Sequence, residues 1–262
     1  MIGDLFRLDG AVAFVSGAVG QLSCPVVRAL GEAGAHVILN GRQAHRLEAF
    51  AAALKAEGIS CECAPFDMAD FAAVRAFFAG RGRLDVLVNL AIAMTGKPFA
   101  ALEPADFAAT YMSSVTASFE ATRAALPALR KAVALTGEAR VINISTMYAL
   151  VAPDARIYNA PEQQSPFHYG PAKAALLQLT RHLAAELAPE KIRVNALVPG
   201  PFPKPEVAAQ DPAFAARLAA KTMLGRLGQA EEIAGPLLFL ATKASSYVTG
   251  TALAVDGGWT AW

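Results

Sequence analysis

Short apolar runs alternate with stretches of helical periodicity along this chain, and this alternation constrains its fold more than any other feature. The run 11–16 ends at Gly17, and apolar residues recur at helical spacing in the stretch 25–34 that follows. Strands that alternate with helices are joined by right-handed crossovers, which make neighbouring strands parallel. We therefore predict an α/β fold of the Rossmann type, a doubly wound parallel sheet of about seven strands with helices on both faces. The strands are expected at 11–16, 35–40, 60–65, 84–90, 140–145, 193–198 and 251–255.

The other stretches carry the helical pattern. One long helix is expected from Pro104 to about Lys131, with Pro127 as a possible bend. The polar segment 153–166 is expected to be a surface loop that precedes a further helix. No repeat, low-complexity tract or linker divides the sequence, so we expect a single domain over residues 1–262.

Composition limits the location and the partners of this chain. Hydrophobic residues make up 55% and charged residues 17%, which favours a sheet covered on both faces and a sizeable subunit interface. The 23 basic residues nearly balance the 22 acidic ones, so we expect neither nucleic acid nor a membrane as a partner. The N-terminus lacks a signal-peptide pattern and no apolar run reaches membrane-spanning length, which predicts a soluble cytoplasmic protein.

The cysteines, Cys24, Cys61 and Cys63, are odd in number and do not form the two ligand pairs of a zinc site. We expect them to be buried as small hydrophobic residues. The sequence therefore predicts a reducing compartment and no metal.

Tyr169 and Lys173 stand four residues apart at the head of an apolar run. On a helix this spacing places a phenol and an ammonium on one face, where both can act on the same ligand. By itself the spacing is more often an ordinary helix face than a catalytic pair. Parallel sheets bind ligands beyond the carboxyl ends of their strands, so the turns after positions 16, 40, 90, 145 and 198 are expected to share one crevice with this pair.

Several segments together carry a family resemblance. They are Val141–Thr146, Tyr169–Lys173, Ile192–Ala196 with Pro199 and Gly200, and Ser246–Gly250 with Val255–Gly258. In this order and spacing the chain resembles the short-chain dehydrogenase/reductase family from about Leu8 onward, and within it the gluconate 5-dehydrogenase and 3-oxoacyl-acyl-carrier-protein reductase-like branch. The resemblance implies an oxidoreductase acting on CH–OH groups that interconverts a small-molecule ketone and a secondary alcohol with a nicotinamide cofactor. It also implies a homotetramer or a homodimer.

The first turn departs from the family pattern of one threonine and three glycines. Gln21 and Ser23 occupy the places of the second and third glycines, and Gly20 lies one place early. Backbone amides at a helix N-terminus still favour an anion, although a plain turn without a nucleotide is the alternative. The resemblance assigns cofactor contacts here to Ser16, Gly17, Gly20, Gln21 and Leu22.

The second strand ends in Asn40, Gly41 and Arg42, where an acidic residue would be expected to hold the ribose of NAD. A guanidinium suits a 2′-phosphate, so NADP(H) is preferred and NAD(H) stays possible. Alternatively, Arg42 caps a surface turn. Asp67, followed by Met68, matches the family's adenine-contacting aspartate or caps the next helix.

The remaining cofactor positions follow later strands. Asn89 is expected to tie neighbouring strands together, and Ile92 stands where the family has a glycine, which removes open space beside the cofactor. The resemblance also assigns cofactor contacts to Asn89, Ala91, Pro199, Gly200 and Lys173.

The resemblance implies a catalytic set of four residues. Tyr169 is the general acid or base, and Lys173 lowers its pKa and holds the nicotinamide ribose. Thr146 aligns with the catalytic serine and steadies the substrate oxygen, while the neighbouring Ser145 points to the opposite face as a structural hydroxyl. Ser114 stands where the family has an asparagine that serves a water chain, and a small packing residue is the alternative there.

Three further expectations stay open. The insert 154–165, with Arg156, Tyr158 and Glu162, suits either a polar substrate or a subunit contact. His168 is interpreted as a surface or packing residue rather than an acid. The apolar tail that ends in Trp259–Trp262 is expected at a subunit interface, with docking on its own core as the alternative. A protein of this fold with weak or no redox activity, which binds a small molecule or a partner, is the second functional hypothesis.

Overall fold

One sheet of seven parallel strands organises the chain in a computed structural model that describes residues 1–160 and 163–262. The strand order is β3-β2-β1-β4-β5-β6-β7, so the order reverses between β1 and β4, which are neighbours. The predicted doubly wound fold is confirmed. The strands are β1 (Val12–Val15), β2 (His36–Gly41), β3 (Cys61–Pro65), β4 (Val86–Asn89), β5 (Ala139–Ile144), β6 (Ile192–Pro199) and β7 (Ala252–Val255).

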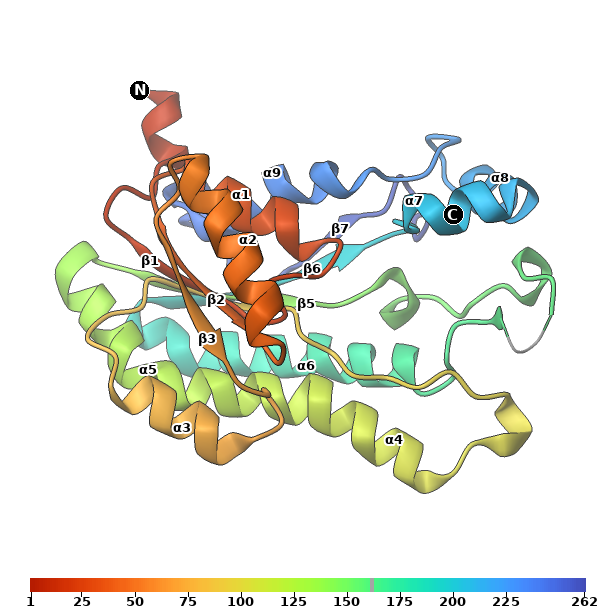
Figure 1. The fold of residues 1–262 in the computed structure, drawn as a ribbon, viewed down its shortest axis with the longest axis horizontal. Helices are drawn as coiled ribbons and strands as arrows, with labels where there is room; N and C mark the ends of the chain where they lie inside the picture. Colours follow the sequence, from red (N-terminus) through yellow and green to blue (C-terminus); the bar gives the residue numbers. More distant parts are fainter. Residues whose placement is uncertain (161–162) are drawn as a thin grey trace.

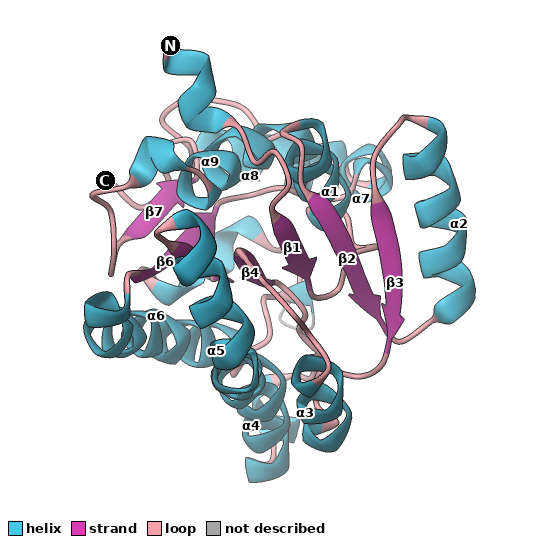
Figure 2. Ribbon diagram, turned by 90° about the vertical axis from the view of Figure 1, so that its left-hand side faces the viewer, coloured by secondary structure: helices cyan, strands magenta, loops and turns pink. Residues whose placement is uncertain are grey.

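Helices cover both faces of the sheet (Figures 1 and 2). One face carries α1 (Ser23–Glu32), α2 (Ala44–Ala56) and α9 (Ala234–Ala241). The other carries α3 (Phe71–Ala79), α4 (Pro104–Tyr111), α5 (Ala117–Thr136) and α6 (Tyr169–Leu187). Two short helices, α7 (Pro205–Gln210) and α8 (Pro212–Ala220), lie beyond the carboxyl end of β6 (Figure 1).

Alternation along the strands divides the core between these two layers. In β1, Ala13 and Val15 pack toward α1, whereas Phe14 packs toward α3 and α5. All three side chains are buried. A strand covered on both faces is apolar throughout, which is why the sequence shows continuous apolar runs rather than an apolar and polar alternation.

The long helix predicted over 104–131 contains an irregularity. Between α4 and α5, residues Met112–Thr116 form a single π-helical turn, and the helix continues to Thr136 before Gly137 ends it with φ of 90°. Pro127 lies inside the helix. Turns of the π type are rare and often lie at functional sites, and no feature of the apolar periodicity indicated this one.

The aromatic tail docks mainly on its own chain, so the expected subunit contact is wrong for Trp259. That side chain is 1% exposed and belongs to a small cluster with Met147, Ile157 and Leu218. The indole of Trp262 is exposed, and its Nε1 donates to the carbonyl of Lys221 at 3.0 Å. Ile157 of the insert and Leu218 of α8 provide the apolar contacts that bury Trp259. Both residues lie far from Trp259 in the sequence, so no local pattern could indicate this docking.

The cysteines are free thiols; Cys61 is buried, and Cys24 and Cys63 are half-buried. Burial raises the pKa of each of the three thiols. In the described part of the chain, no helix is both long and apolar enough to cross a membrane.

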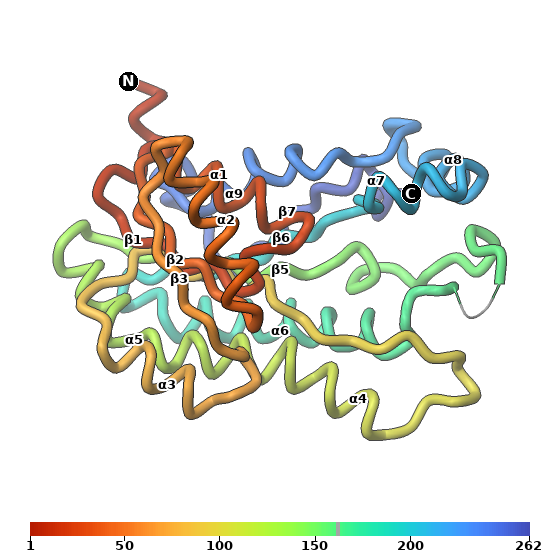
Figure 3. Tube along the Cα trace, in the orientation of Figure 1, coloured from red at the N-terminus to blue at the C-terminus, as the bar shows by residue number. Residues whose placement is uncertain are grey.

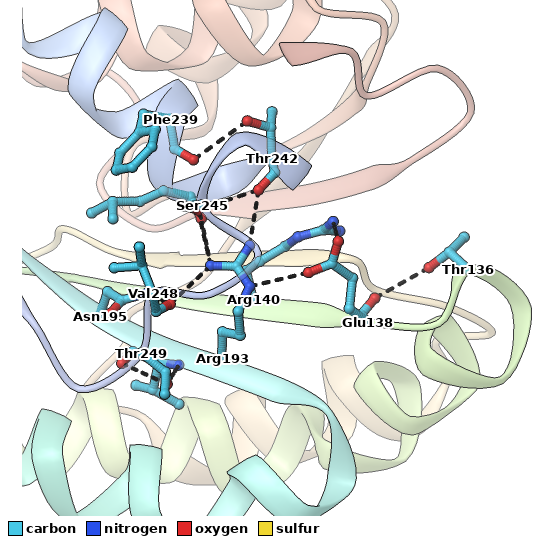
Figure 4. Close-up of polar contacts among 12 residues, drawn as sticks. Thr136, Glu138, Arg140, Arg193, Asn195, Phe239, Thr242, Ser245, Val248 and Thr249 are labelled. Atoms are coloured by element: carbon cyan, nitrogen blue, oxygen red, sulfur yellow. Dashed lines mark hydrogen bonds and ion pairs between the residues drawn. The ribbon is translucent and has the colours of Figure 1, made fainter. Parts of the chain in front are cut away.

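Glu138, Arg140 and Arg193 form a buried ion cluster (Figure 4). It lies at the amino ends of β5 and β6, whereas the crevice lies at the carboxyl ends of the strands. The carboxylate of Glu138 accepts from Arg193 Nε at 3.0 Å and from Arg140 Nη2 at 2.5 Å. The two arginine side chains are 8% and 6% exposed. The Arg193 guanidinium also donates to the carbonyls of Leu240, Thr242 and Val248 and to the hydroxyl of Ser245.

We predict that Glu138→Gln destabilises the fold by roughly 3 kcal/mol, because it removes the one carboxylate that both buried guanidinium groups contact. Urea unfolding followed by circular dichroism measures the loss. The matched control is Glu57→Gln, which breaks an exposed pair with Arg28 and should destabilise the fold far less, because solvent and salt screen this pair. Equal losses in the two variants would contradict a stabilising role of the cluster.

Candidate active site

The predicted catalytic pair lies at the start of α6, beside the carboxyl end of β5. Tyr169 is the first residue of this helix, and Lys173 follows one turn later, 3% exposed. Lys173 Nζ donates to the carbonyl of Ile144 at 2.6 Å. The ammonium is therefore held against the last residue of β5, close to the turn that carries Ser145 and Thr146.

Burial controls the ionisation of this pair. Loss of solvent lowers the pKa of Lys173 to about 7. Burial raises the pKa of Tyr169, and a hydrogen bond with Thr146 acts in the opposite direction. The sequence led us to expect that Lys173 lowers the pKa of Tyr169. In the chain without a cofactor the pKa of Tyr169 is instead raised, and a lysine with a pKa near 7 is only partly charged at neutral pH.

The two adjacent hydroxyls after β5 have different surroundings. Ser145 Oγ donates to the carbonyl of Lys173 at 3.1 Å and is buried. Thr146 Oγ1 lies on the other side, where it reaches Tyr169 and the backbone N–H of Tyr148. The structure thus places Thr146 with Tyr169, and Ser145 in a contact with the helix backbone.

Ser114 lies in the π-turn and is 1% exposed. Among the described residues, its hydroxyl has no hydrogen-bond partner, whereas its carbonyl accepts from Ser118 Oγ at 2.6 Å. A buried hydroxyl without a protein partner is a position where an ordered water is expected.

The altered first turn is closed by its own side chains. Gly17 has φ of +66°, and a Cβ there would lie 3.1 Å from Cα of Ala91, so the turn approaches the end of β4 closely. Ser23 Oγ, in place of a glycine, donates to the carbonyl of Gly17 at 2.6 Å. Ser16 Oγ accepts from the backbone N–H groups of Leu90 and Ala91 at 2.9 and 3.0 Å. The two turns therefore form one rigid edge.

Gln21 makes a second contact across the sheet. Its amide nitrogen donates to the carbonyls of Phe202 and Pro203, at 3.2 and 3.0 Å, in the segment that follows β6. A glycine at this position could not form these bonds. Leu22 is the residue before α1, and Gly200 N donates to the carbonyl of Val255 at the end of β7.

A cavity of about 430 Å³ opens where β1, β2 and β4 end. The predicted cofactor residues that do not line it are Gln21, Leu22, Lys173, Pro199 and Gly200, together with Ser16 and Asn89, which are buried. Sequence reasoning missed Gln43, Arg46 and Ser113, which also line it. The predicted residues that line it are Gly17, Gly20, Asn40, Arg42, Asp67, Met68 and Ala91.

Two arginines give one end of this cavity a positive charge. Arg42 Nη1 lies 3.9 Å from the carboxylate of Asp67, and its side chain is 70% exposed. Arg46, in the first turn of α2, donates to the carbonyl of Val19 in the turn after β1 at 3.5 Å. Asp67 also accepts from the N–H of Ala69, which fits the capping alternative, although the cap of α3 itself is Asp70.

Asparagines fix the strand ends beneath the cavity. Asn89 Nδ2 donates to Asn143 Oδ1 at 2.9 Å, and Asn143 Nδ2 donates to Thr180 Oγ1 of α6 at 2.9 Å. Asn40 Nδ2 donates to the carbonyls of Ala64 and Phe66. The described placement of Asn89 is the strand tie expected from the sequence.

The described part of the insert packs on its own chain. Asp154 accepts from Arg156 and from Lys221, which follows α8, and the hydroxyl of Tyr158 bonds that of Tyr148 at 2.6 Å. Burial raises the pKa of Tyr148. Glu162 lies outside the described residues.

Comparison with known proteins identifies the family. The profile described as Enoyl-(Acyl carrier protein) reductase matches residues 22–260. The chain belongs to the short-chain dehydrogenase/reductase family. It is 34% identical to the rhamnolipids biosynthesis 3-oxoacyl-[acyl-carrier-protein] reductase of Pseudomonas aeruginosa over 97% of each chain.

Solved structures of this family superpose closely on the whole chain. The Pseudomonas aeruginosa RhlG/NADP active-site complex has a TM-score of 0.88 at 33% identity, covering 98% of this chain and 99% of that one. A gluconate 5-dehydrogenase from Burkholderia cenocepacia J2315, in complex with NADP and tartrate, has a TM-score of 0.87 at 32% identity and covers 100% of both. The predicted branch is confirmed, and these short-chain dehydrogenase/reductase relatives are oxidoreductases.

We predict that the stability of this family member depends on pH through Lys173. The folded pKa near 7 lies below the value of about 10.4 for an unfolded chain, so the unfolded state binds more protons between these two pH values. The unfolding free energy therefore rises as pH increases from 7 to 9, by up to about 1.4 kcal/mol per pH unit relative to Lys173→Met. Urea unfolding at three pH values measures it, and a difference between the two proteins that is constant with pH would contradict the burial.

Proposed function

We propose that this chain is an NADP(H)-dependent oxidoreductase that interconverts a ketone and a secondary alcohol. The observation that carries the proposal is the convergence of Tyr169, Lys173 and Thr146 at the end of β5, on the same edge of the sheet as a cavity with two arginines. Parallel sheets bind dinucleotides at this edge, where the strand order reverses.

The cavity residues suit NADP(H). Gly17 and Gly20 let the first turn pack closely, because a Cβ would lie 3.1 Å from Cα of Ala91 or 3.0 Å from Oγ of Ser23. The backbone amides before α1 favour an anion such as a diphosphate. Arg42 and Arg46 supply the positive charge that a 2′-phosphate requires. Both NADP complexes described above support the same preference.

The chain's own residues would divide the work as follows. When bound, NADPH supplies the hydride, which a protein side chain cannot. The hydroxyl of Tyr169 donates its proton to the substrate oxygen as negative charge develops there, and the hydroxyl of Thr146 donates a hydrogen bond to the same oxygen. Lys173 holds the nicotinamide ribose and, when charged, favours the phenolate. In the alcohol-oxidising direction Tyr169 accepts the proton.

We also propose that the chain forms an oligomer. Large apolar side chains are exposed along α4, the π-turn and α5: those of Tyr111, Met112 and Phe119, with exposed fractions of 39%, 45% and 42%. Exposed apolar surface of this kind is typical of subunit contacts. We infer a homotetramer, or a homodimer, with a small-molecule carbonyl or alcohol substrate and a cytoplasmic location.

A second candidate is a protein of this fold with weak redox activity that binds a small molecule or a partner. The bonds of Gln21 to the segment after β6 and the serine at position 114 favour it, because both differ from the family pattern. The two candidates make opposite predictions about Tyr169.

We predict that Tyr169→Phe lowers kcat for carbonyl reduction by at least about a hundredfold, because the general acid is removed while the ring is kept. Loss of NADPH absorbance with 5-ketogluconate and with a 3-oxoacyl thioester measures turnover, and the Kd of NADPH should change less than about threefold. Tyr158→Phe is the matched control, since it removes a hydroxyl bonded to Tyr148. Unchanged turnover in Tyr169→Phe would refute the proposed acid, and no turnover in the native protein would favour the second candidate.

We predict that Arg42→Ala raises the Kd of NADPH about tenfold to a hundredfold, because a charge-assisted hydrogen bond contributes about 1.5–3 kcal/mol. The Kd of NADH should stay within about twofold, since NADH lacks the 2′-phosphate. Nicotinamide fluorescence titration measures both constants. Arg123→Ala on the outer face of α5 is the control, and equal weakening of both cofactors in Arg42→Ala would contradict the assignment.

A further inference from the structure

His168, directly before Tyr169, is buried rather than on the surface. The residue is only 1% exposed, and its imidazole makes hydrogen bonds through both ring nitrogens. Nδ1 lies 2.9 Å from Oγ1 of Thr110 in α4, and Nε2 lies 3.1 Å from the carbonyl oxygen of Thr95. The ring of Phe107 packs against the imidazole edge to face, with centroids 5.9 Å apart.

These two contacts fix one tautomer. The Thr95 carbonyl can only accept, so Nε2 must carry a proton and donate it. Thr110 Oγ1 can donate, so a neutral ring accepts at Nδ1. The hydroxyl of Thr110, the imidazole of His168 and the Thr95 carbonyl thus form one directed chain of hydrogen bonds between α4, the start of α6 and the segment after β4.

The segment that His168 holds also forms the cavity wall. It follows β4 and is the yellow stretch of the tube in Figure 3. Its residues 90–93 line the cavity. Ser113 of the π-turn holds Ala93, accepting from its N–H at 3.3 Å and donating to its carbonyl at 2.9 Å. Farther along, Phe99 packs on Phe167, with ring centroids 5.0 Å apart. Between these two attachments the segment makes two polar side-chain contacts: the carbonyl of Thr95 accepts from His168, and Lys97 Nζ donates to the carboxylate of Asp106 in α4 at 2.9 Å. Of these two, the contact with His168 joins the segment to the start of α6.

We propose that His168 is a positioning residue that holds the segment after β4 against the N-terminus of α6, and so sets the position of Tyr169 relative to the cavity wall. This inference rests on the proposed function. Tyr169 shares a peptide bond with His168, and the imidazole anchors the backbone at that point to two other elements. Loss of this anchor would release the backbone at Thr95 from the start of α6, while the contacts of Ala93, Lys97 and Phe99 would remain.

Three substitutions separate the two hydrogen bonds. In His168→Gln the amide reaches the position of Nε2 and can still donate to the Thr95 carbonyl. In His168→Asn the amide reaches only the position of Nδ1, near Thr110. Thr110→Val keeps the imidazole and removes only the donor to Nδ1. The control is His182→Asn on the exposed face of the same helix.

We expect His168→Asn to lower kcat about tenfold with a change of less than about threefold in the Kd of NADPH, and His168→Gln to recover kcat to within about threefold of the native protein. Equal loss of kcat in the Gln and Asn variants, or a loss seen only in KM for the carbonyl substrate, would overturn the proposal.

Two further readouts do not need turnover. Nitrogen NMR of the imidazole should show a proton on Nε2 in the native protein and also in Thr110→Val, because that variant keeps the Thr95 carbonyl that accepts this proton. Amide hydrogen exchange at residues 93–97 should accelerate at least about tenfold in His168→Asn and not in His168→Gln. A ring protonated at Nδ1, or exchange that is unchanged in His168→Asn, would overturn the inference. If the native protein showed no turnover, the proposed function would fail while these readouts still decided the role of His168.

Discussion

The buried ammonium of Lys173 is the constraint on which the rest of the site depends. It donates to the carbonyl of Ile144 at 2.6 Å, while the hydroxyl of Ser145 donates to the carbonyl of Lys173 at 3.1 Å. Each of two neighbouring elements thus satisfies a polar group of the other, and a buried polar group costs free energy unless it has such a hydrogen-bond partner. Because α6 and the end of β5 are fastened in both directions, Tyr169 and Thr146 have defined positions on either side of this junction.

The cofactor side of the crevice departs from the family pattern and compensates locally. Ser23 closes the first turn on Gly17, and Gln21 ties that turn to the segment after β6, where glycines would leave both contacts unmade. Positive charge comes from Arg42 and Arg46 together, at the end of the cavity formed by β2 and α2. A first turn held by these side-chain hydrogen bonds is more rigid before the cofactor binds than a turn built from glycines, because glycines leave the backbone more conformational freedom.

Much of this architecture could be predicted because it depends on local pattern: continuous apolar runs gave the parallel sheet, and segments around Tyr169 gave the family. What escaped prediction depends on contacts between distant residues. The carbonyl that holds Lys173 lies 29 positions away, and Trp259 is buried by α8 and the insert rather than by a second subunit. Arg46 was missed because an arginine on a helix has no sequence signal that separates a cavity from solvent. His168 was interpreted as a surface or packing residue because its partners, a threonine and a backbone carbonyl, form no motif.

The measurement that tests the account most directly is a crystal structure of the protein grown with NADP. The account predicts the diphosphate at the amides of the first turn, the 2′-phosphate between Arg42 and Arg46, and the nicotinamide within reach of Tyr169 and Lys173, with Ser23 still closing the turn on Gly17. An empty cavity at millimolar NADP, or a nucleotide bound elsewhere on the chain, would contradict it.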